Sequence, residues 1–121
     1  MIALVDDDDA VLEATASLLR SLGYTVQAFR SGGTFLDWTG LDKTSCLIAD
    51  VMMPEIDGYE LQRRLVIRGY RFPIIFLTAI TEASAQMRLM KHGAHCVLGK
   101  PCSQQTLVES IESAIHYGEH G

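Results

Sequence analysis

Three carboxylates, one hydroxyl and one ammonium group stand at or just past the ends of short apolar runs in this sequence. They belong to Asp6, Asp7, Asp50, Thr78 and Lys100. Such runs are typical of buried parallel strands, and ligands of open parallel sheets bind outside the carboxyl ends of the strands. One polar residue in this position is usually just solvated where a strand meets a loop. Five of them after four runs indicate a common site at one sheet edge.

The chemistry that such a set could perform is phosphoryl transfer to a carboxylate. Carboxylates a few ångströms apart raise one another's pKa unless a cation lies between them. Mg²⁺ fits best, because it accepts one or two carboxylates and keeps positions for water and phosphoryl oxygens. An unpaired Lys100 would supply a positive charge for an anion. A carboxylate nucleophile beside a metal and a lysine could form an aspartyl phosphate.

The elements that must position these groups alternate strictly along the chain. Apolar runs predict strands over residues 2–5, 24–29, 46–49, 73–77 and 95–98. Helical spacing of apolar residues predicts helices over 11–22, 31–38, 57–69, 81–92 and 103–115. Their predicted N-terminal residues are Asp8 and Asp9 for the first helix, and Ser31, Asp57 and Ser103 for later ones. Glycines 23, 69 and 93 are predicted to end helices.

Strict alternation of strands and helices predicts an α/β fold. Right-handed crossovers then give a parallel sheet with helices on both faces. The sequence shows no internal repeat or linker, and we expect residues 39–45 to be only a surface connection. The length of 121 residues predicts one domain with a core of its own.

Composition excludes several classes of protein. A net charge of −5 leaves the domain without the basic footprint that nucleic acids or anionic membranes require. No apolar run approaches the roughly 18 residues of a membrane-spanning helix, and the N-terminus does not resemble a signal peptide. Three cysteines without paired spacing indicate a reducing, cytoplasmic environment with free thiols.

Four motifs in this order resemble the receiver domain of two-component response regulators. They are Val5-Asp6-Asp7, Asp50 with Met53-Pro54 and Gly58, Phe76-Leu77-Thr78-Ala79, and Gly93-Ala94 with Lys100-Pro101. The resemblance runs from end to end, so residues 1–121 are interpreted as one receiver domain. It implies a doubly wound, flavodoxin-like fold with five helices and a five-stranded parallel sheet in the order 2-1-3-4-5.

The resemblance also implies the roles of the acidic residues. Asp50 would be the phospho-acceptor. Mg²⁺ would be the cofactor, bound directly by Asp7, Asp50 and the backbone carbonyl of Met52, with Asp6 acting through water. The loop containing Met53-Pro54 and Gly58 would shape the turn beside the acceptor.

The implied phosphate ligands lie later in the chain. Thr78 would hydrogen-bond the phosphoryl group, the backbone amide of Ala79 would reach it, and Lys100 would pair with it. The Lys100-Pro101 peptide is often cis in this family. One position departs from the pattern, because Val97 stands where such receivers often carry the aromatic residue of the output switch.

The implied function is a phosphorylation-dependent signalling switch, not an enzyme beyond its own phosphorylation and dephosphorylation. A sensor histidine kinase would be the donor. Phosphorylation would alter the face made by the fourth and fifth helices and the fifth strand, and so control a protein effector or a DNA-binding output domain outside these residues. The domain itself would bind neither nucleic acid nor membrane. It could form a homodimer through that face or through the first and fifth helices.

Two rival functions remain on the sequence alone. A haloacid-dehalogenase-type phosphohydrolase would explain the D-x-D spacing of Asp6 and Asp8 and the following threonine and lysine. That family needs a further acidic pair on a later strand, however, and would leave Asp50 without a role. A docking module that ignores phosphate would leave the whole acidic group unexplained.

Two other groups of residues receive simpler interpretations. Four arginines on and after the third helix are interpreted as a solvated helix face; they are Arg63, Arg64, Arg68 and Arg71. Met87 and Met90 are predicted to fill the core beneath the fourth helix.

Overall fold

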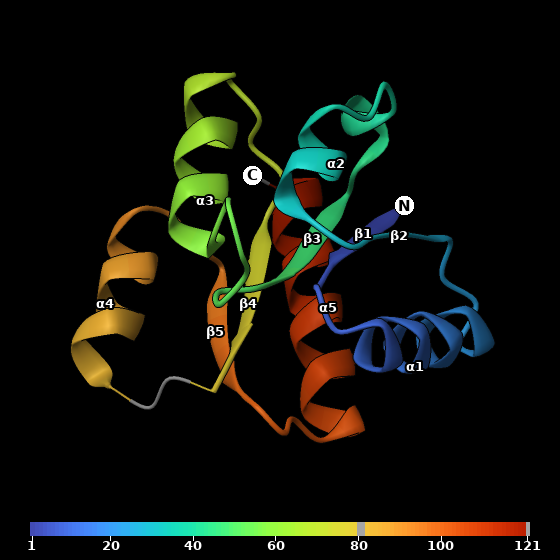
Figure 1. Ribbon diagram of the computed structural model, residues 1–121. Helices are drawn as coiled ribbons and strands as arrows, with labels where there is room; N and C mark the ends of the chain where they lie inside the picture. Colours follow the sequence, from blue (N-terminus) through green and yellow to red (C-terminus); the bar gives the residue numbers. More distant parts are fainter. Residues whose placement is uncertain (80–81, 121) are drawn as a thin grey trace.

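A five-stranded parallel sheet forms the centre of the computed structural model, which describes residues 1–79 and 82–120 (Figure 1). Its strands are β1 (Ile2–Val5), β2 (Val26–Phe29), β3 (Cys46–Asp50), β4 (Ile74–Thr78) and β5 (Cys96–Gly99). Their order is β2-β1-β3-β4-β5, as expected, and every neighbouring pair is parallel. The fold is therefore the predicted doubly wound α/β arrangement.

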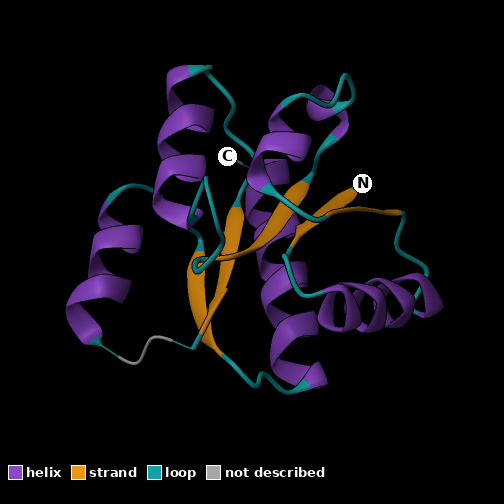
Figure 2. Cartoon of the chain, viewed as in Figure 1, coloured by secondary structure: helices purple, strands orange, loops and turns teal. Residues whose placement is uncertain are grey.

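Helices cover both faces of this sheet (Figure 2). They are α1 (Asp9–Ser21), α2 (Gly32–Leu36), α3 (Gly58–Ile67), α4 (Ala83–Lys91) and α5 (Gln104–His120). Successive strand residues point to opposite faces. Ala3 and Val5 accordingly belong to the core under α2, α3 and α4, whereas Ile2 and Leu4 belong to the core under α1 and α5. Burial on both faces explains why β1 and β3 read as unbroken apolar runs.

The helices begin where the sequence places capping residues. The Asp8 carboxylate accepts hydrogen bonds from the backbone N–H groups of Ala10 and Val11. Ser31, Asp57 and Ser103 each accept a bond from the backbone N–H three residues later. Such caps satisfy N–H groups that have no partner within the helix, which fixes the helix starts locally.

The structure corrects two expectations. Residues 39–45 are more than a surface connection, because they include the 3₁₀ helix η1 (Leu41–Lys43), and Leu41 and Thr44 are buried. The prediction that Met87 and Met90 fill the core is wrong, since both side chains are exposed. The physical reason is that α4 inserts only Leu89 fully into the core. The predicted start of this helix at Thr81 lies outside the described residues.

All three cysteines are free thiols, as predicted. Cys46 is completely buried at the start of β3. Burial, with a smaller contribution from Cys96, raises the pKa of the Cys46 thiol to about 12. Because the thiolate is the reactive form, a buried thiol of this kind is inert.

We therefore expect iodoacetamide at pH 8 to alkylate Cys102, which is partly exposed, while Cys46 reacts only after global unfolding. Peptide mass mapping over time measures both sites in one sample. The raised pKa also predicts that the contribution of Cys46 to stability is complete below its ordinary pKa of 9.0 and is lost as the pH rises toward 12. Equal alkylation rates at the two cysteines in folded protein would contradict this expectation.

Candidate functional site

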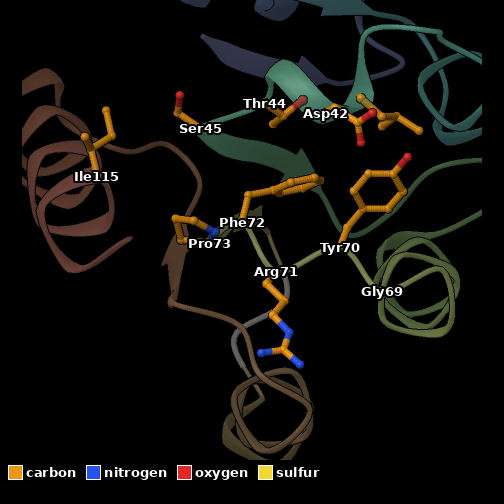
Figure 3. A pocket seen from close by; sticks show the side chains of 10 residues that line it. Asp42, Thr44, Ser45, Gly69, Tyr70, Arg71, Phe72, Pro73 and Ile115 are labelled. Carbon is orange, nitrogen blue, oxygen red and sulfur yellow. The ribbon is translucent and has the colours of Figure 1, made fainter. Parts of the chain in front are cut away.

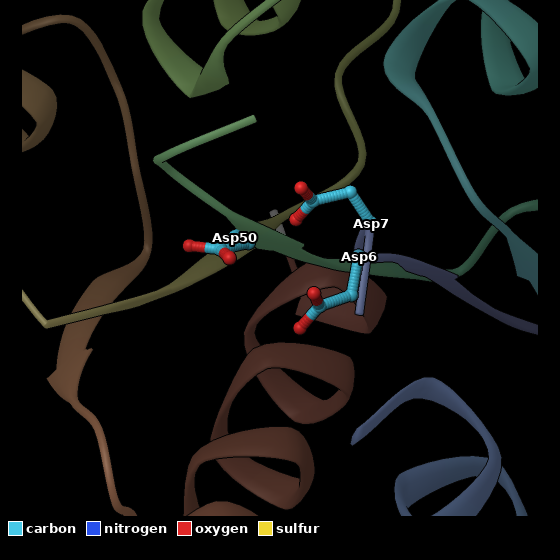
Figure 4. Close-up of side chains that lie close together, drawn as sticks. All are labelled: Asp6, Asp7 and Asp50. Atoms are coloured by element: carbon cyan, nitrogen blue, oxygen red, sulfur yellow. The ribbon is translucent and has the colours of Figure 1, made fainter. Parts of the chain in front are cut away.

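Three carboxylates meet at the carboxyl ends of β1 and β3 (Figure 4). Asp6 and Asp7 directly follow β1, and Asp50 is the last residue of β3. Carboxylate oxygens from all three lie within 4.8 Å of one another. Asp6 and Asp50 are buried, whereas Asp7 is exposed. The strands are neighbours in the sheet, so their register places residues 6 and 50 at the same edge.

Backbone turns fix the orientation of the two buried carboxylates. The N–H of Asp8 donates to Asp6 Oδ1 at 2.9 Å, and the N–H of Met52 donates to Asp50 Oδ1 at 3.1 Å. Hydrogen bonds to an ionised oxygen are stronger than those between neutral groups. Each carboxylate is therefore held by the chain that follows its own strand.

Lys100 links both buried carboxylates, although the sequence suggested an unpaired lysine. Its Nζ lies 3.0 Å from Asp6 Oδ2 and 3.0 Å from Asp50 Oδ2. Partial burial of Lys100 disfavours its charged form, but the hydrogen bonds and negative charges of Asp50 and Asp6 outweigh that effect and raise its pKa above the ordinary value. Lys100 therefore stays cationic at neutral pH and offsets part of the repulsion between the carboxylates.

The donor set fits a small divalent cation. The cluster offers only carboxylate oxygens, with Asp7 on the solvent side, and hard cations such as Mg²⁺ prefer oxygen ligands. One lysine does not neutralise three carboxylates, so a cation here would relieve the remaining repulsion.

Thr78 and Lys100 come from the two neighbouring strands. Thr78 ends β4 and is buried, and it pairs with Gly99 in the β4–β5 register. The Lys100 N–H donates to the Thr78 carbonyl at 2.8 Å, which holds the lysine beside β4. The following peptide, Lys100-Pro101, is cis, as the resemblance implied. Ala79 is exposed at the end of β4. The structure thus brings these residues to the carboxylate edge.

Val97 lies on β5 opposite Phe76, two residues before the Thr78–Gly99 pair. Because strand side chains alternate, residues 76 and 78 share one face of the sheet, the face that α4 covers. Val97 is partly exposed and packs against the core on this side. Val97 therefore lies on the same face of the sheet as Phe76, the face that α4 covers.

The loop after Asp50 depends on Gly58. The Gly58 N–H donates to the Val51 carbonyl at 2.8 Å. A Cβ atom at residue 58 would lie 2.8 Å from Val51 Cα and 3.0 Å from Phe76 Cε1. The first distance involves backbone, which cannot turn away. Only glycine fits where α3 approaches the end of β3 this closely.

A Gly58→Ala substitution should therefore lower the free energy of unfolding by about 1–3 kcal/mol, as overpacking of a tight site does. Denaturant unfolding followed by circular dichroism measures the change. Gly33→Ala is the matched control, because its nearest neighbour would be Ile56 Cδ1 at 3.8 Å, an ordinary contact. A Gly58→Ala variant as stable as this control would refute the steric argument.

A separate hollow lies at the opposite end of the sheet (Figure 3). Its volume is about 500 Å³, and Thr44, Tyr70 and Phe72 are among the residues that line it. It also touches Ser45 and Pro73, which directly precede β3 and β4, whereas Asp50 and Thr78 end those strands. This hollow is therefore not part of the carboxylate site.

A parallel 2-1-3-4-5 sheet with acidic residues at the carboxyl ends of its first and third strands, a threonine at the end of the fourth and a lysine just after the fifth defines the receiver class of signalling domains. The chain matches the response regulator receiver domain over residues 2–112. It belongs to this family, which sets the phosphohydrolase alternative aside.

Individual relatives agree with this assignment. The response regulator protein TmoT of Ectopseudomonas mendocina is 40% identical over 115 residues, which are 95% of this chain and 52% of that protein. The transcriptional regulatory protein FixJ of Bradyrhizobium diazoefficiens is 36% identical, over 98% of this chain and 58% of that protein. A solved structure of the response regulator StyR superposes with a TM-score of 0.91 at 36% identity, covering 98% of this chain and 60% of that one.

The chain spans about half the length of the curated relatives that it matches. Within the part of the chain that the structure describes, no helix has the length and apolar character needed to cross a membrane. Sequence reasoning predicted that Asp6, Asp50 and Lys100 lie at one edge of the sheet but missed the contacts between them. No local signal indicates that Lys100 bridges Asp6 and Asp50, because these residues are 94 and 50 positions away from it.

Proposed function

We propose that residues 1–121 are one receiver domain, in which Asp50 accepts a phosphoryl group from a phosphohistidine of a sensor histidine kinase. The observation that carries this proposal is the position of the Asp50 carboxylate, which lies within 4.8 Å of two other carboxylates and 3.0 Å from Lys100 Nζ. A phosphoryl group on Asp50 would enter a site that already holds a fixed cation. The domain acts as a signalling protein and not as a classical enzyme.

In the proposed transfer, an Asp50 carboxylate oxygen forms a bond to phosphorus as the P–N bond of the phosphohistidine breaks. The departing imidazole nitrogen keeps the electron pair of that bond. The Met52 N–H orients the carboxylate, and Lys100 neutralises charge on the phosphoryl oxygens. Later hydrolysis of the aspartyl phosphate would return the domain to its resting state.

Mg²⁺ is the proposed cofactor. Asp7, Asp50 and the Met52 carbonyl would bind it directly, with Asp6 acting through water. When bound, the ion would neutralise charge on the transferred phosphoryl group. The all-oxygen donor set and the exposure of Asp7 support this assignment.

Thr78, the Ala79 amide and Lys100 are proposed to bind the phosphoryl group. Lys100 would exchange its contact with Asp50 for a phosphoryl oxygen, and the Thr78 hydroxyl would move toward the same group. Val97 has a stiff branched side chain and cannot swing as an aromatic ring can. We therefore infer that the signal leaves through the segment after Thr78 and through α4. Residues 80–81 of that segment lie outside the described residues.

The proposed partners follow from the relatives. Two of them are named transcriptional regulatory proteins, and the matched segment makes up 49% and 58% of their lengths. We propose a cytoplasmic domain that controls a DNA-binding output domain or a protein effector through the face of α4, β5 and α5. The same face, or that of α1 and α5, would form a phosphorylation-dependent homodimer. The domain itself would bind neither nucleic acid nor membrane.

Incubation with acetyl phosphate and Mg²⁺ tests the proposed function. The intact mass should rise by one phosphoryl group, and EDTA should abolish the increase. Mg²⁺ alone should raise the melting temperature of the wild-type chain progressively as the free Mg²⁺ concentration rises, but not that of an Asp7→Ala variant. A phospho-adduct that forms equally in EDTA, or rapid turnover of para-nitrophenyl phosphate, would overturn this assignment.

A further inference from the structure

A groove between α3 and α4 lies outside the site at the carboxyl ends of the strands. Its volume is about 290 Å³, and its walls include Tyr59, Val66 and Ile67 from α3 together with Arg88 and His92. The Gln62 side chain donates to the Leu89 carbonyl at 3.0 Å and connects the two helices. This buried bond fixes the groove on a rigid pair of elements.

Apolar side chains are exposed along one wall of this groove. Val66 is 60% exposed and Ile67 is 69% exposed, and the two are adjacent at the end of α3. Single exposed apolar residues are normal on a protein surface. Here, however, two of them border a hollow that also contains the Tyr59 ring, which gives a partner an apolar surface to cover.

The rim of the groove is basic in an otherwise acidic chain. Residues 58–99 carry six of the ten lysines and arginines but only two of the fifteen acidic residues. The Arg88 guanidinium lies 4.5 Å from the centre of the Tyr59 ring, which places a cation at the mouth of the groove. Arg63 and Arg64 share Glu60, so their charges exceed that of their partner. Of the four arginines interpreted as a solvated helix face, Arg63 lines this groove together with Arg88, whereas Arg71 lines the separate hollow beside Tyr70 and Phe72.

We propose that this groove is a docking surface for an acidic amphipathic helix of a partner protein. The partner is acidic because the rim is basic, and amphipathic because Val66 and Ile67 need apolar cover. The partner segment is a helix, because the groove walls are helices. Helices offer side chains but no free backbone edge to which an extended peptide could add as a strand. The open strand edges belong to β2 and β5. A nucleic acid is a poorer candidate for this groove, because its charged phosphate backbone gains nothing from contact with exposed apolar side chains.

A designed peptide tests this proposal on unphosphorylated protein, so the result is independent of phosphoryl transfer. The probe is a fluorescein-labelled helix with leucines at i, i+3, i+4 and i+7 and glutamates elsewhere. Fluorescence anisotropy should show saturable binding that weakens as salt increases. Replacing both apolar residues (Val66→Ser with Ile67→Ser), or Arg88→Gln alone, should weaken binding about tenfold or more.

Matched surface variants serve as controls. Leu22 follows α1 and Arg30 follows β2; both are exposed, and neither lines the groove. Leu22→Ser and Arg30→Gln should therefore leave the affinity for the peptide unchanged. Amide shift changes in the wild-type protein should cover residues 59–67 and 88–92, a readout that depends on no variant. The proposal is overturned by equal binding of a scrambled or lysine-substituted peptide, by competition from duplex DNA, or by shift changes confined to other surfaces.

Discussion

The Asp50→Asn variant is expected to show no phospho-adduct after incubation with acetyl phosphate and Mg²⁺, whereas the wild-type chain gains one phosphoryl group. An amide oxygen lacks the negative charge that makes a carboxylate nucleophilic, so the P–O bond cannot form at residue 50. The amide oxygen can still accept the Met52 N–H bond, which keeps the local turn. Intact-mass spectrometry measures the adduct directly.

Stability separates loss of the nucleophile from loss of the fold. Asparagine removes one of the clustered negative charges but fits the same space, so the free energy of unfolding should change by no more than about 1 kcal/mol. Asp9→Asn is the matched control, because Asp9 is exposed on α1 and pairs with Arg30. It should be phosphorylated like the wild type. An adduct that survives Asp50→Asn in folded protein would disprove the acceptor assignment.

The Thr78→Ala variant should lose the conformational response of α4 while keeping the response of the acidic site. Beryllofluoride mimics a phosphoryl group on a carboxylate, and in the wild type we expect amide shift changes concentrated in residues 78–92. A ligand shifts a conformational equilibrium only by its difference in interaction free energy between the two states. The Thr78 hydroxyl would supply that difference, about 0.5–1.5 kcal/mol for one hydrogen bond.

Thr44→Ala is the matched control for this substitution. Thr44 is also a buried threonine, but it precedes β3 at the opposite end of the sheet from Asp50. It should leave the response of α4 intact. If the shift changes instead centre on Val97 and β5 and persist in Thr78→Ala, this account of the switch is wrong.

Much of the fold was readable in the sequence, because local physics encodes it. Residues 2–5 and 46–49 are buried on both faces of the sheet, so their apolar runs are unbroken. Asp8 marks the start of α1, because a carboxylate at that point satisfies N–H groups two and three residues later. The site residues could be predicted for a related reason, since parallel strands place their carboxyl ends at one edge.

Only the tertiary structure decided how those residues contact one another. The ion pairs of Lys100 with Asp6 and Asp50 join segments that are far apart in the sequence. A local sequence pattern cannot predict which carboxylate oxygens a distant lysine contacts. The exposure of Met87 also could not be predicted from the sequence. Helical spacing shows which residues share a face, but how deeply a helix sits depends on its packing, and α4 inserts only Leu89 fully into the core.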